Sequence, residues 1–304
     1  MCEAARISRE ATQSHCLVSK SLDLRLFENP LRIEFMAKSK VNKKTRALKR
    51  PLWVIKIGSQ IIIDEGPLFV RGLIRDITIL KLKHRVDVIV VTSGAIASAR
   101  IRLRKQWHSL PEKQALSALG QPMIMELYNA ALHSYGQLGA QVLLTYADFK
   151  NTKSRHNFRN TLKQLLKWKV VPILNENDAI ATEEIQFGDN DLLSALVAAD
   201  MKASKLILLT NVDGVYDRAP NEKNACLIPV LHNVFSKQIS TSLSPSKSKH
   251  GRGGMASKLQ SAQKASQSGV DTLIVNGSKP KVLLEIAQGR NPGTLIPSQK
   301  RGDS

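Results

Sequence analysis

The feature that most constrains the fold is a regular alternation of short apolar runs with longer helical patterns. Six runs are continuous, apolar and rich in β-branched residues, which is typical of strands buried on both faces: LWVIKI (52–57), DVIVVT (87–92), AQVLLT (140–145), VVPIL (170–174), KLILLT (205–210) and VDTLIV (270–275). Between them apolar residues recur at the spacing of amphipathic helices, over 113–136 and roughly over 156–168, 190–201, 255–268 and 280–288. This alternation predicts an α/β fold, a three-layer αβα sandwich around a central, mostly parallel sheet.

The composition agrees with one globular domain. The chain has 304 residues, of which 42% are hydrophobic and 23% charged, and these values exclude an intrinsically disordered protein. No apolar run approaches the ~18 residues of a membrane span, so we expect a soluble protein that does not use a membrane. No repeat or linker divides the chain after residue 50, and residues 48–304 are therefore predicted to form a single domain.

Residues 1–47 are expected to form a basic, flexible extension ahead of that domain. The stretch Met36–Arg50 has seven basic residues and no acid. Such a tail can bind nucleic acid or an acidic surface, but a solvated arm is the simpler interpretation. Residues 1–35 have the features of neither a secretory signal nor a transit peptide, and Met36 is a candidate alternative start. Three scattered cysteines favour a reducing, cytoplasmic setting.

One segment, NENDAIATEEIQFGDND (175–191), concentrates carboxylates and amides in a chain whose formal charge is +20. No Lys or Arg occurs between Val170 and Met201. The segment follows the predicted strand VVPIL, and parallel sheets bind ligands beyond the carboxyl ends of their strands. A solvated acidic loop is the alternative, and a site for a ligand is the interpretation that the flanking motifs favour.

Two other strand ends carry candidate anion-binding groups. Lys56 stands near the end of the first strand and is followed by Gly58 and Ser59, which together offer a cation and free backbone amides. The alternative is a lysine that reaches out of an edge strand. Ser93 follows the second strand among small residues that allow a ligand close to the backbone. The alternative there is an ordinary N-cap serine.

A glycine-rich segment, GRGGMASK (251–258), precedes an amphipathic helix. Its backbone N–H groups are suited to cradling phosphate, and Lys258 adds positive charge. The segment is not a Walker A motif, no GxGxxG follows the first strand, and a lysine-flanked surface loop would look similar. Together, however, two lysines, a glycine-rich cradle and a carboxylate–amide cluster suit transfer of a phosphoryl group, with a carboxylate between the ammonium groups to hold both in position.

Five segments resemble motifs of the glutamate 5-kinases, a branch of the amino acid kinase family. In the family's order they are VIKIGSQ, VVTSGAIA, VVPILNENDAIATEEIQFGDNDLLSAL, LLTNVDGVY and GRGGMASKLQSA. The similarity runs from about Pro51 to Ile296, and its NEND and FGDND elements are specific to this branch. The resemblance implies the amino acid kinase fold. It also implies ATP-dependent phosphorylation of the γ-carboxylate of L-glutamate to γ-glutamyl phosphate, the first step of proline biosynthesis.

The resemblance also implies a role for each motif residue. Lys56 and Lys258 would contact the transferring phosphoryl group, and Asp191 would organise both lysines. The residues that would bind glutamate, whose α-ammonium needs such acceptors, are Ser93, Asp178 and Asn190, with Asn175 and Asp189 nearby. The residues that would line the ATP site are Lys56, Gly58, Ser59, Thr210, Asn211, Arg252, Gly253, Gly254, Met255, Ala256, Ser257 and Lys258. Mg²⁺ would be held mainly by the phosphates of ATP.

The chain departs from the family pattern at three points. Asn211 stands where the family usually has Asp, and Arg252 replaces a small residue in the glycine-rich segment. The chain stops soon after PGTLI, so the C-terminal PUA domain of many bacterial members is expected to be absent. The resemblance further implies a homo-oligomer and feedback inhibition by proline.

Two other functions stay open from the sequence. One is a different amino acid kinase, acting on N-acetylglutamate or a nucleoside monophosphate, although acceptors for a free ammonium at Asp178 and Asn190 favour glutamate. The other is a nucleic-acid-binding protein on an inactive kinase fold, which the charge of +20 supports. Retention of both lysines and Asp191 counts against that function, so we do not expect a nucleic-acid partner.

Overall fold

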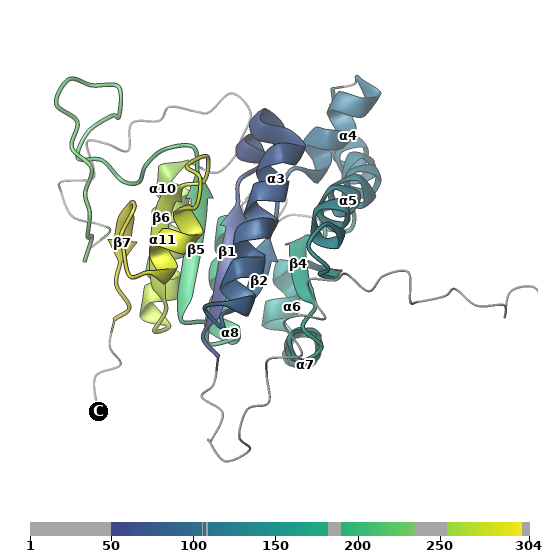
Figure 1. Ribbon diagram of the computed structural model, residues 1–304. Helices are drawn as coiled ribbons and strands as arrows, with labels where there is room; N and C mark the ends of the chain where they lie inside the picture. The colour runs from purple at the N-terminus through teal and green to yellow at the C-terminus, as the bar shows by residue number, and fades with distance from the viewer. Residues whose placement is uncertain are drawn as a thin grey trace, which may run out of the picture. The chain divides into compact units, whose positions relative to one another are not determined.

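The computed structural model describes residues 50–104, 106–107, 109–181, 190–232, 234 and 254–299. In these residues a seven-stranded sheet forms the centre of the fold (Figure 1). Its strands are β1 (Leu52–Ile57), β2 (Asp87–Val91), β3 (Gly139–Leu144), β4 (Val171–Glu176), β5 (Lys205–Thr210), β6 (Asp271–Asn276) and β7 (Thr294–Ile296). They lie in the order β3-β4-β2-β1-β5-β6-β7, all parallel except β7, which runs antiparallel to β6.

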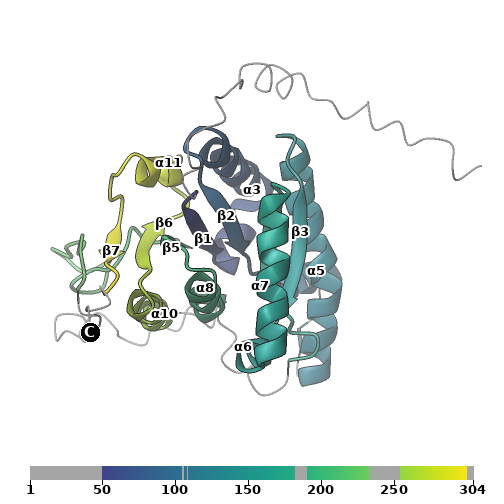
Figure 2. The same cartoon turned by 90° about the horizontal axis from the view of Figure 1, so that it is seen from below.

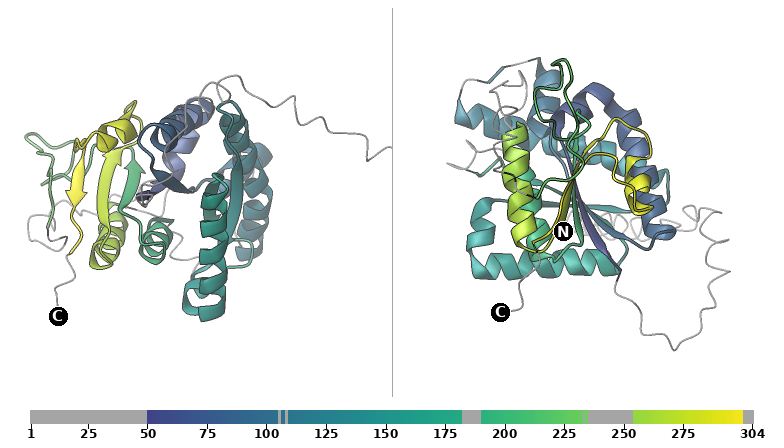
Figure 3. Two further views of the ribbon diagram at one scale, coloured as in Figure 1. Left: turned by 60° about the horizontal axis from the view of Figure 1, so that its bottom comes forward. Right: turned by 90° about the vertical axis from the view of Figure 1, so that its left-hand side faces the viewer.

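Helices cover both faces of the sheet, which confirms the predicted three-layer αβα sandwich (Figures 2 and 3). One layer contains α3 (Ser59–Leu82), α5 (Leu110–His133) and α11 (Val282–Ala287), with α4 (Ala95–Leu103) packed on α5. The other contains α7 (Thr152–Lys167), α8 (Asn190–Asp200) and α10 (Met255–Gln267), and the short α6 (Tyr146–Lys150) precedes α7. No helix in the described ranges has the length and apolar character to cross a membrane.

Strand β1 shows how the two faces are divided. Trp53, Ile55 and Ile57 pack in the core beneath α3, α5 and α11, whereas Val54 packs in the core beneath α8 and α10. Because successive side chains of a strand point to opposite faces, Lys56 shares the face of Val54. The period of the strand therefore directs this lysine toward α8 and α10.

The position of β1 in the sheet also matters for the site. The strand lies between β2 and β5, so it is central, and the alternative of Lys56 on an edge strand is wrong. Strands β2, β3 and β4 lie on one side of β1, and β5, β6 and β7 lie on the other. Open α/β sheets bind ligands at such a topological switch point, beyond the carboxyl ends of the strands.

The elements predicted from sequence agree with the structure within a few residues. Among the described elements, α3, α6 and β7 were not predicted. Helix α3 follows β1 directly, but Gly66 (φ 62°) and Pro67 kink it and interrupt its helical pattern. Strand β7 has only three residues, too few for a sequence period to be visible. It forms the antiparallel edge of an otherwise parallel sheet.

Candidate active site

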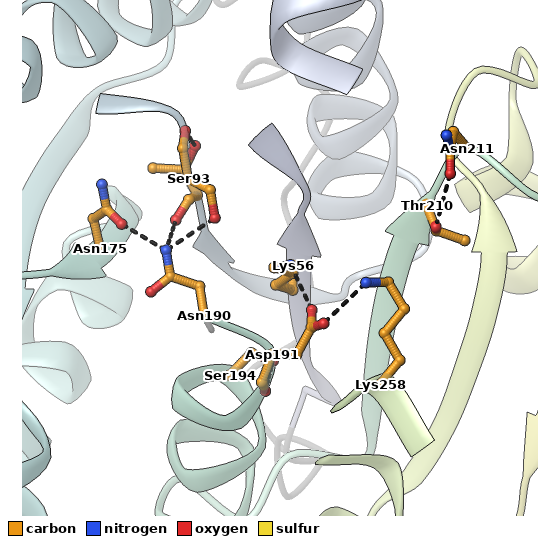
Figure 4. Close-up of polar contacts among 10 residues, drawn as sticks. Lys56, Ser93, Asn175, Asn190, Asp191, Ser194, Thr210, Asn211 and Lys258 are labelled. Carbon is orange, nitrogen blue, oxygen red and sulfur yellow. Dashed lines mark hydrogen bonds and ion pairs between the residues drawn. The ribbon is translucent and has the colours of Figure 1, made fainter. Parts of the chain in front are cut away.

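Two lysines and one aspartate form the buried centre of the site. Lys56 comes from the end of β1, Asp191 from the first turn of α8 and Lys258 from the first turn of α10. Lys56 Nζ lies 2.5 Å from Asp191 Oδ1, and Lys258 Nζ donates a hydrogen bond to Asp191 Oδ2 at 3.0 Å (Figure 4). The exposed fractions of the three side chains are 5%, 0% and 9% for Lys56, Asp191 and Lys258. One carboxylate thus holds two ammonium groups side by side.

The electrostatics of this trio keep Asp191 ionised. Burial raises the pKa of Asp191, but the charges of Lys56 and Lys258, and the hydrogen bonds that they donate, lower it by more. The net pKa lies well below the ordinary range of an aspartate. The trio therefore carries two positive charges and one negative charge, and the surplus positive charge suits an anionic ligand.

A cluster of amides lies on the β2 and β4 side of the trio (Figure 4). Asn190, the first residue of α8, directs its Nδ2 toward three acceptors. They are the Thr92 carbonyl oxygen at 2.7 Å, Ser93 Oγ at 2.9 Å and Asn175 Oδ1 at 2.7 Å. These contacts join the ends of β2 and β4 to the start of α8. Asn190 and Asn175 are both buried.

Ser93 belongs to a tight turn between β2 and α4. The N-cap of α4 is Gly94, in the left-handed conformation with φ 99°, so the alternative of Ser93 as an N-cap is wrong. Helix α5 presses on this turn at Gly120, where a Cβ would lie 1.8 Å from the Ala95 carbonyl oxygen. The absence of a side chain at Gly120 therefore lets α5 fix the position of the turn that carries Ser93.

The remaining predicted substrate residues are placed only in part. Asp178 is half-buried in the turn that follows β4, where the N–H groups of Ile180 and Ala181 both donate to the Asn177 carbonyl oxygen. Asp189 lies outside the described residues. The structure therefore brings Ser93, Asn175 and Asn190 together and adds Asp178 on the segment after β4.

The predicted nucleotide residues lie around the other side of the trio. Thr210 ends β5 and Asn211 follows it, and both lie on the side of Lys258 opposite the amide cluster (Figure 4). Gly58 and Ser59 begin α3, while Gly254, Met255, Ala256 and Ser257 begin α10. Helix starts at this edge of the sheet present free N–H groups and the positive end of the helix dipole. Arg252 and Gly253 lie outside the described residues.

Some residues near the site were not predicted from sequence. Asp213 forms an ion pair with Lys279 at 2.8 Å and accepts a hydrogen bond from Asn276 Nδ2 at 2.9 Å, which lowers the pKa of Asp213. These contacts tie the loop after β5 to the loop after β6.

On α5, Gln121 and Tyr128 are buried next to the amide cluster. The one sequence signal for Gln121 is a polar residue on the apolar face of a helix, since partners distant in sequence leave no local pattern.

The arrangement is suited to moving a phosphoryl group. Two ammonium groups stabilise charge that develops on phosphoryl oxygens, and their fixed position requires no reorganisation during the reaction. Thr210 and Asn211 lie on one side of them and the amide cluster lies on the other (Figure 4). The fold and the site therefore define the class of protein as a phosphotransferase.

Comparison with known proteins identifies the family. Residues 51–276 match the amino acid kinase family. A glutamate 5-kinase of Clostridium acetobutylicum is 40% identical over 255 residues, which are 81% of this chain and 95% of that protein. A glutamate 5-kinase of Caldanaerobacter subterraneus subsp. tengcongensis is 42% identical over 250 residues, 80% of this chain and 67% of that protein. The chain belongs to the amino acid kinase family, and these relatives within it are glutamate 5-kinases.

Solved structures support the fold. The UMP kinase of Ureaplasma parvum superposes with a TM-score of 0.56 at 16% identity, covering 82% of this chain and all of that chain. An isopentenyl phosphate kinase superposes with the same TM-score of 0.56 at 15% identity, covering 81% of this chain and 99% of that chain. At such identities the likeness is one of fold alone.

Proposed function

We propose that the protein phosphorylates the γ-carboxylate of L-glutamate with ATP, giving γ-glutamyl phosphate and ADP in the first step of proline biosynthesis. The observation that carries this proposal is the contact of Lys56 and Lys258 with the two oxygens of Asp191, next to a buried cluster of amides. The relatives at about 40% identity are glutamate 5-kinases, which supports the same activity.

The reaction needs no general base, because the attacking γ-carboxylate is already ionised at neutral pH. One of its oxygens forms a bond to the γ-phosphorus of ATP as the bond from that phosphorus to the bridging oxygen of ADP breaks. Lys56 and Lys258 neutralise the negative charge on the phosphoryl oxygens during this transfer. Asp191 holds the two ammonium groups in a fixed geometry.

Glutamate would bind on the amide side of the lysines. Its α-ammonium is a donor only, so it needs carboxylate and carbonyl oxygens around it. Asp178 offers a carboxylate and Asn190 offers a carbonyl oxygen, while Ser93, Asn175 and Asp189 complete the predicted set. An N-acetylated substrate lacks the cationic ammonium, so these acceptors favour the free amino acid.

ATP would bind on the side of Thr210 and Asn211, with its phosphates at the starts of α3 and α10. Mg²⁺ accompanies ATP in this proposal and is held mainly by the phosphates. Each oxygen of Asp191 faces an ammonium group, so we assign that carboxylate no role as a metal ligand. When bound, the ion neutralises part of the phosphate charge.

Three further features belong to the proposal. The enzyme is a homo-oligomer, proline inhibits it by feedback, and it works in the cytoplasm, which the three scattered cysteines favour. Sizing chromatography, a proline titration of turnover and microscopy of a tagged chain test these features separately.

The deciding experiment is an ADP-release assay with four acceptors: glutamate, N-acetylglutamate, aspartate and UMP. We expect turnover with glutamate and little with the other three. Turnover with N-acetylglutamate or UMP instead would assign another amino acid kinase activity. RNA binding that falls steeply with salt, in the absence of any ATP turnover, would favour a nucleic-acid-binding protein.

A further inference from the structure

Gln121 links the amide cluster to the interior of α5. The side chain is buried and makes three hydrogen bonds. Its Oε1 accepts from Asn175 Nδ2 at 3.2 Å and from Gln141 Nε2 at 3.0 Å, and its Nε2 donates to the Glu176 carbonyl oxygen at 3.2 Å. Gln121 on α5 is therefore bonded to Gln141 on β3 and to Asn175 and Glu176 on β4.

Backbone groups determine which way these amides face. The Glu176 N–H can only donate, and it donates to Asn175 Oδ1 at 3.0 Å, so Asn175 must turn its Nδ2 toward Gln121. The Glu176 carbonyl oxygen can only accept, so Gln121 must turn its Nε2 toward it and its Oε1 toward Asn175. The backbone N–H and carbonyl groups of Glu176 thus orient the side-chain amides of Asn175 and Gln121.

The same logic extends to Asn190. The Thr92 carbonyl oxygen and Asn175 Oδ1 both accept from Asn190 Nδ2, which leaves Asn190 Oδ1 on the other side of the amide. That oxygen is buried and receives no hydrogen bond from the described residues. A buried acceptor without a donor is costly unless a ligand supplies one.

We infer, given the proposed function, that Gln121 is a positioning residue that selects for the amino group of the substrate. It holds Asn175, and Asn175 holds Asn190 in the orientation that presents Oδ1 to the α-ammonium of an amino acid. Without the Gln121 side chain, Asn175 Nδ2 becomes a buried donor with no acceptor. Asn175 can find another acceptor only by moving away from Asn190. Asn190 then loses one of the contacts that fix its amide.

The test compares two ligands that differ only in the amino group. Glutamate carries the α-ammonium, and glutarate is the same five-carbon dicarboxylate without it. Gln121→Met keeps the length and volume of the side chain and removes its hydrogen bonds. We expect this variant to raise the KM for glutamate about tenfold, while the inhibition constant of glutarate and the KM for ATP change less than about twofold.

Two variants separate positioning from a general loss of structure. Gln121→Glu keeps both acceptor contacts and, in its protonated form, still has a donor for the Glu176 carbonyl oxygen, so it should recover most of the preference for glutamate over glutarate. Tyr128→Phe is the matched control, because it removes another buried hydrogen bond from α5 to the same region, the 3.0 Å contact of Tyr128 Oη with Thr92 Oγ1. It should lower the melting temperature to a similar degree and leave the preference unchanged.

The outcomes distinguish this inference from the proposed function. No turnover of glutamate by the wild-type chain would overturn the proposed function itself. Suppose that the wild type is active and that Gln121→Met weakens the binding of glutamate and of glutarate equally, or weakens the binding of neither. Gln121 then has no role in recognising the amino group. The inference also fails if Tyr128→Phe reduces the preference as much as Gln121→Met does.

Discussion

The ammonium of Lys56 lies 2.5 Å from a carboxylate oxygen of Asp191 and thereby joins the central strand β1 to the first turn of α8. The other oxygen of Asp191 contacts Lys258 at the start of α10. Three elements that are distant in sequence are held together by one buried charge. This contact gives the site its geometry, and we therefore expect its stability and its activity to depend on the same atoms.

Removing either lysine should reduce turnover far more than substrate binding. Lys258→Ala and Lys56→Ala each take away a cation that acts chiefly on the transition state, so we expect kcat to fall on the order of 10²-fold or more. The KM for glutamate should change much less. Steady-state kinetics of both variants measure this. A kcat near that of the wild type would remove the lysine concerned from the catalytic set.

The trio should behave as one unit in stability. Asp191→Asn leaves two buried ammonium groups without their counterion, and loss of one partner from a buried ion pair costs about 3–5 kcal/mol. Lys258→Met removes one of those ammonium groups in advance. We therefore expect the double variant to be more stable than the sum of the single effects predicts, by about 0.5–3 kcal/mol. Urea unfolding of the four proteins gives this coupling energy, and additive effects would contradict it.

Asp178→Asn keeps the shape of the side chain and removes its charge. A charge-assisted hydrogen bond contributes about 1.5–3 kcal/mol, so we expect the KM for glutamate to rise by roughly one to two orders of magnitude. The KM for ATP should hardly change, because ATP is proposed to bind on the other side of the lysines. Initial rates at varied glutamate and varied ATP measure both constants. The opposite pattern would mean that the two sites are exchanged.

A buried lysine outside the site, Lys81, should make stability depend on pH. Lys81 on α3 donates to Gln137 Oε1 at 2.6 Å and to the Lys169 carbonyl oxygen at 2.7 Å. Burial lowers the pKa of Lys81 to about 8, although Asp87 opposes this; the positive charges of Arg50 and Lys169 lower it further.

The sign of this effect follows from proton binding. Between pH 8 and the ordinary pKa of 10.5, the unfolded chain holds a proton on Lys81 that the folded protein has released. The free energy of unfolding should therefore rise with pH in the wild type relative to Lys81→Met over this window. Urea titrations from pH 7 to pH 10 measure the difference. Lys83→Met, at an exposed neighbouring position, should keep the wild-type slope.

Removal of residues 1–47 should leave the kinase domain intact. These residues show no sustained apolar period, so a chain that begins near Lys49 should fold, keep its melting temperature within a few degrees and retain its turnover. Its retention on an anionic resin should fall, most visibly at low salt, because the deleted segment has a positive net charge. Thermal melts, sizing chromatography and kinetics compare the two chains. Aggregation, a changed oligomeric state or lost activity would show that the extension is structural.

The sequence by itself determined the parallel strands, most of the helices between them and the strand ends that carry the candidate site. Buried parallel strands need continuous apolar runs, so β1 to β6 were visible as local patterns, and glycines and lysines at their ends marked candidate anion sites. These are properties of neighbouring residues. The motif resemblance then supplied roles for Lys56, Asp191 and Lys258.

The tertiary structure decided which of those residues meet and how they face. Lys56 reaches Asp191 because strand parity places it on the α8 side and because β1 is central. The orientation of Asn190 depends on Thr92, Asn175 and, behind them, Gln121. No local pattern encodes these relations, because a hydrogen bond between distant elements depends on strand order, packing distance and the direction of a single amide. A glutamine on the buried face of α5 became informative only when its partners on β3 and β4 were in place.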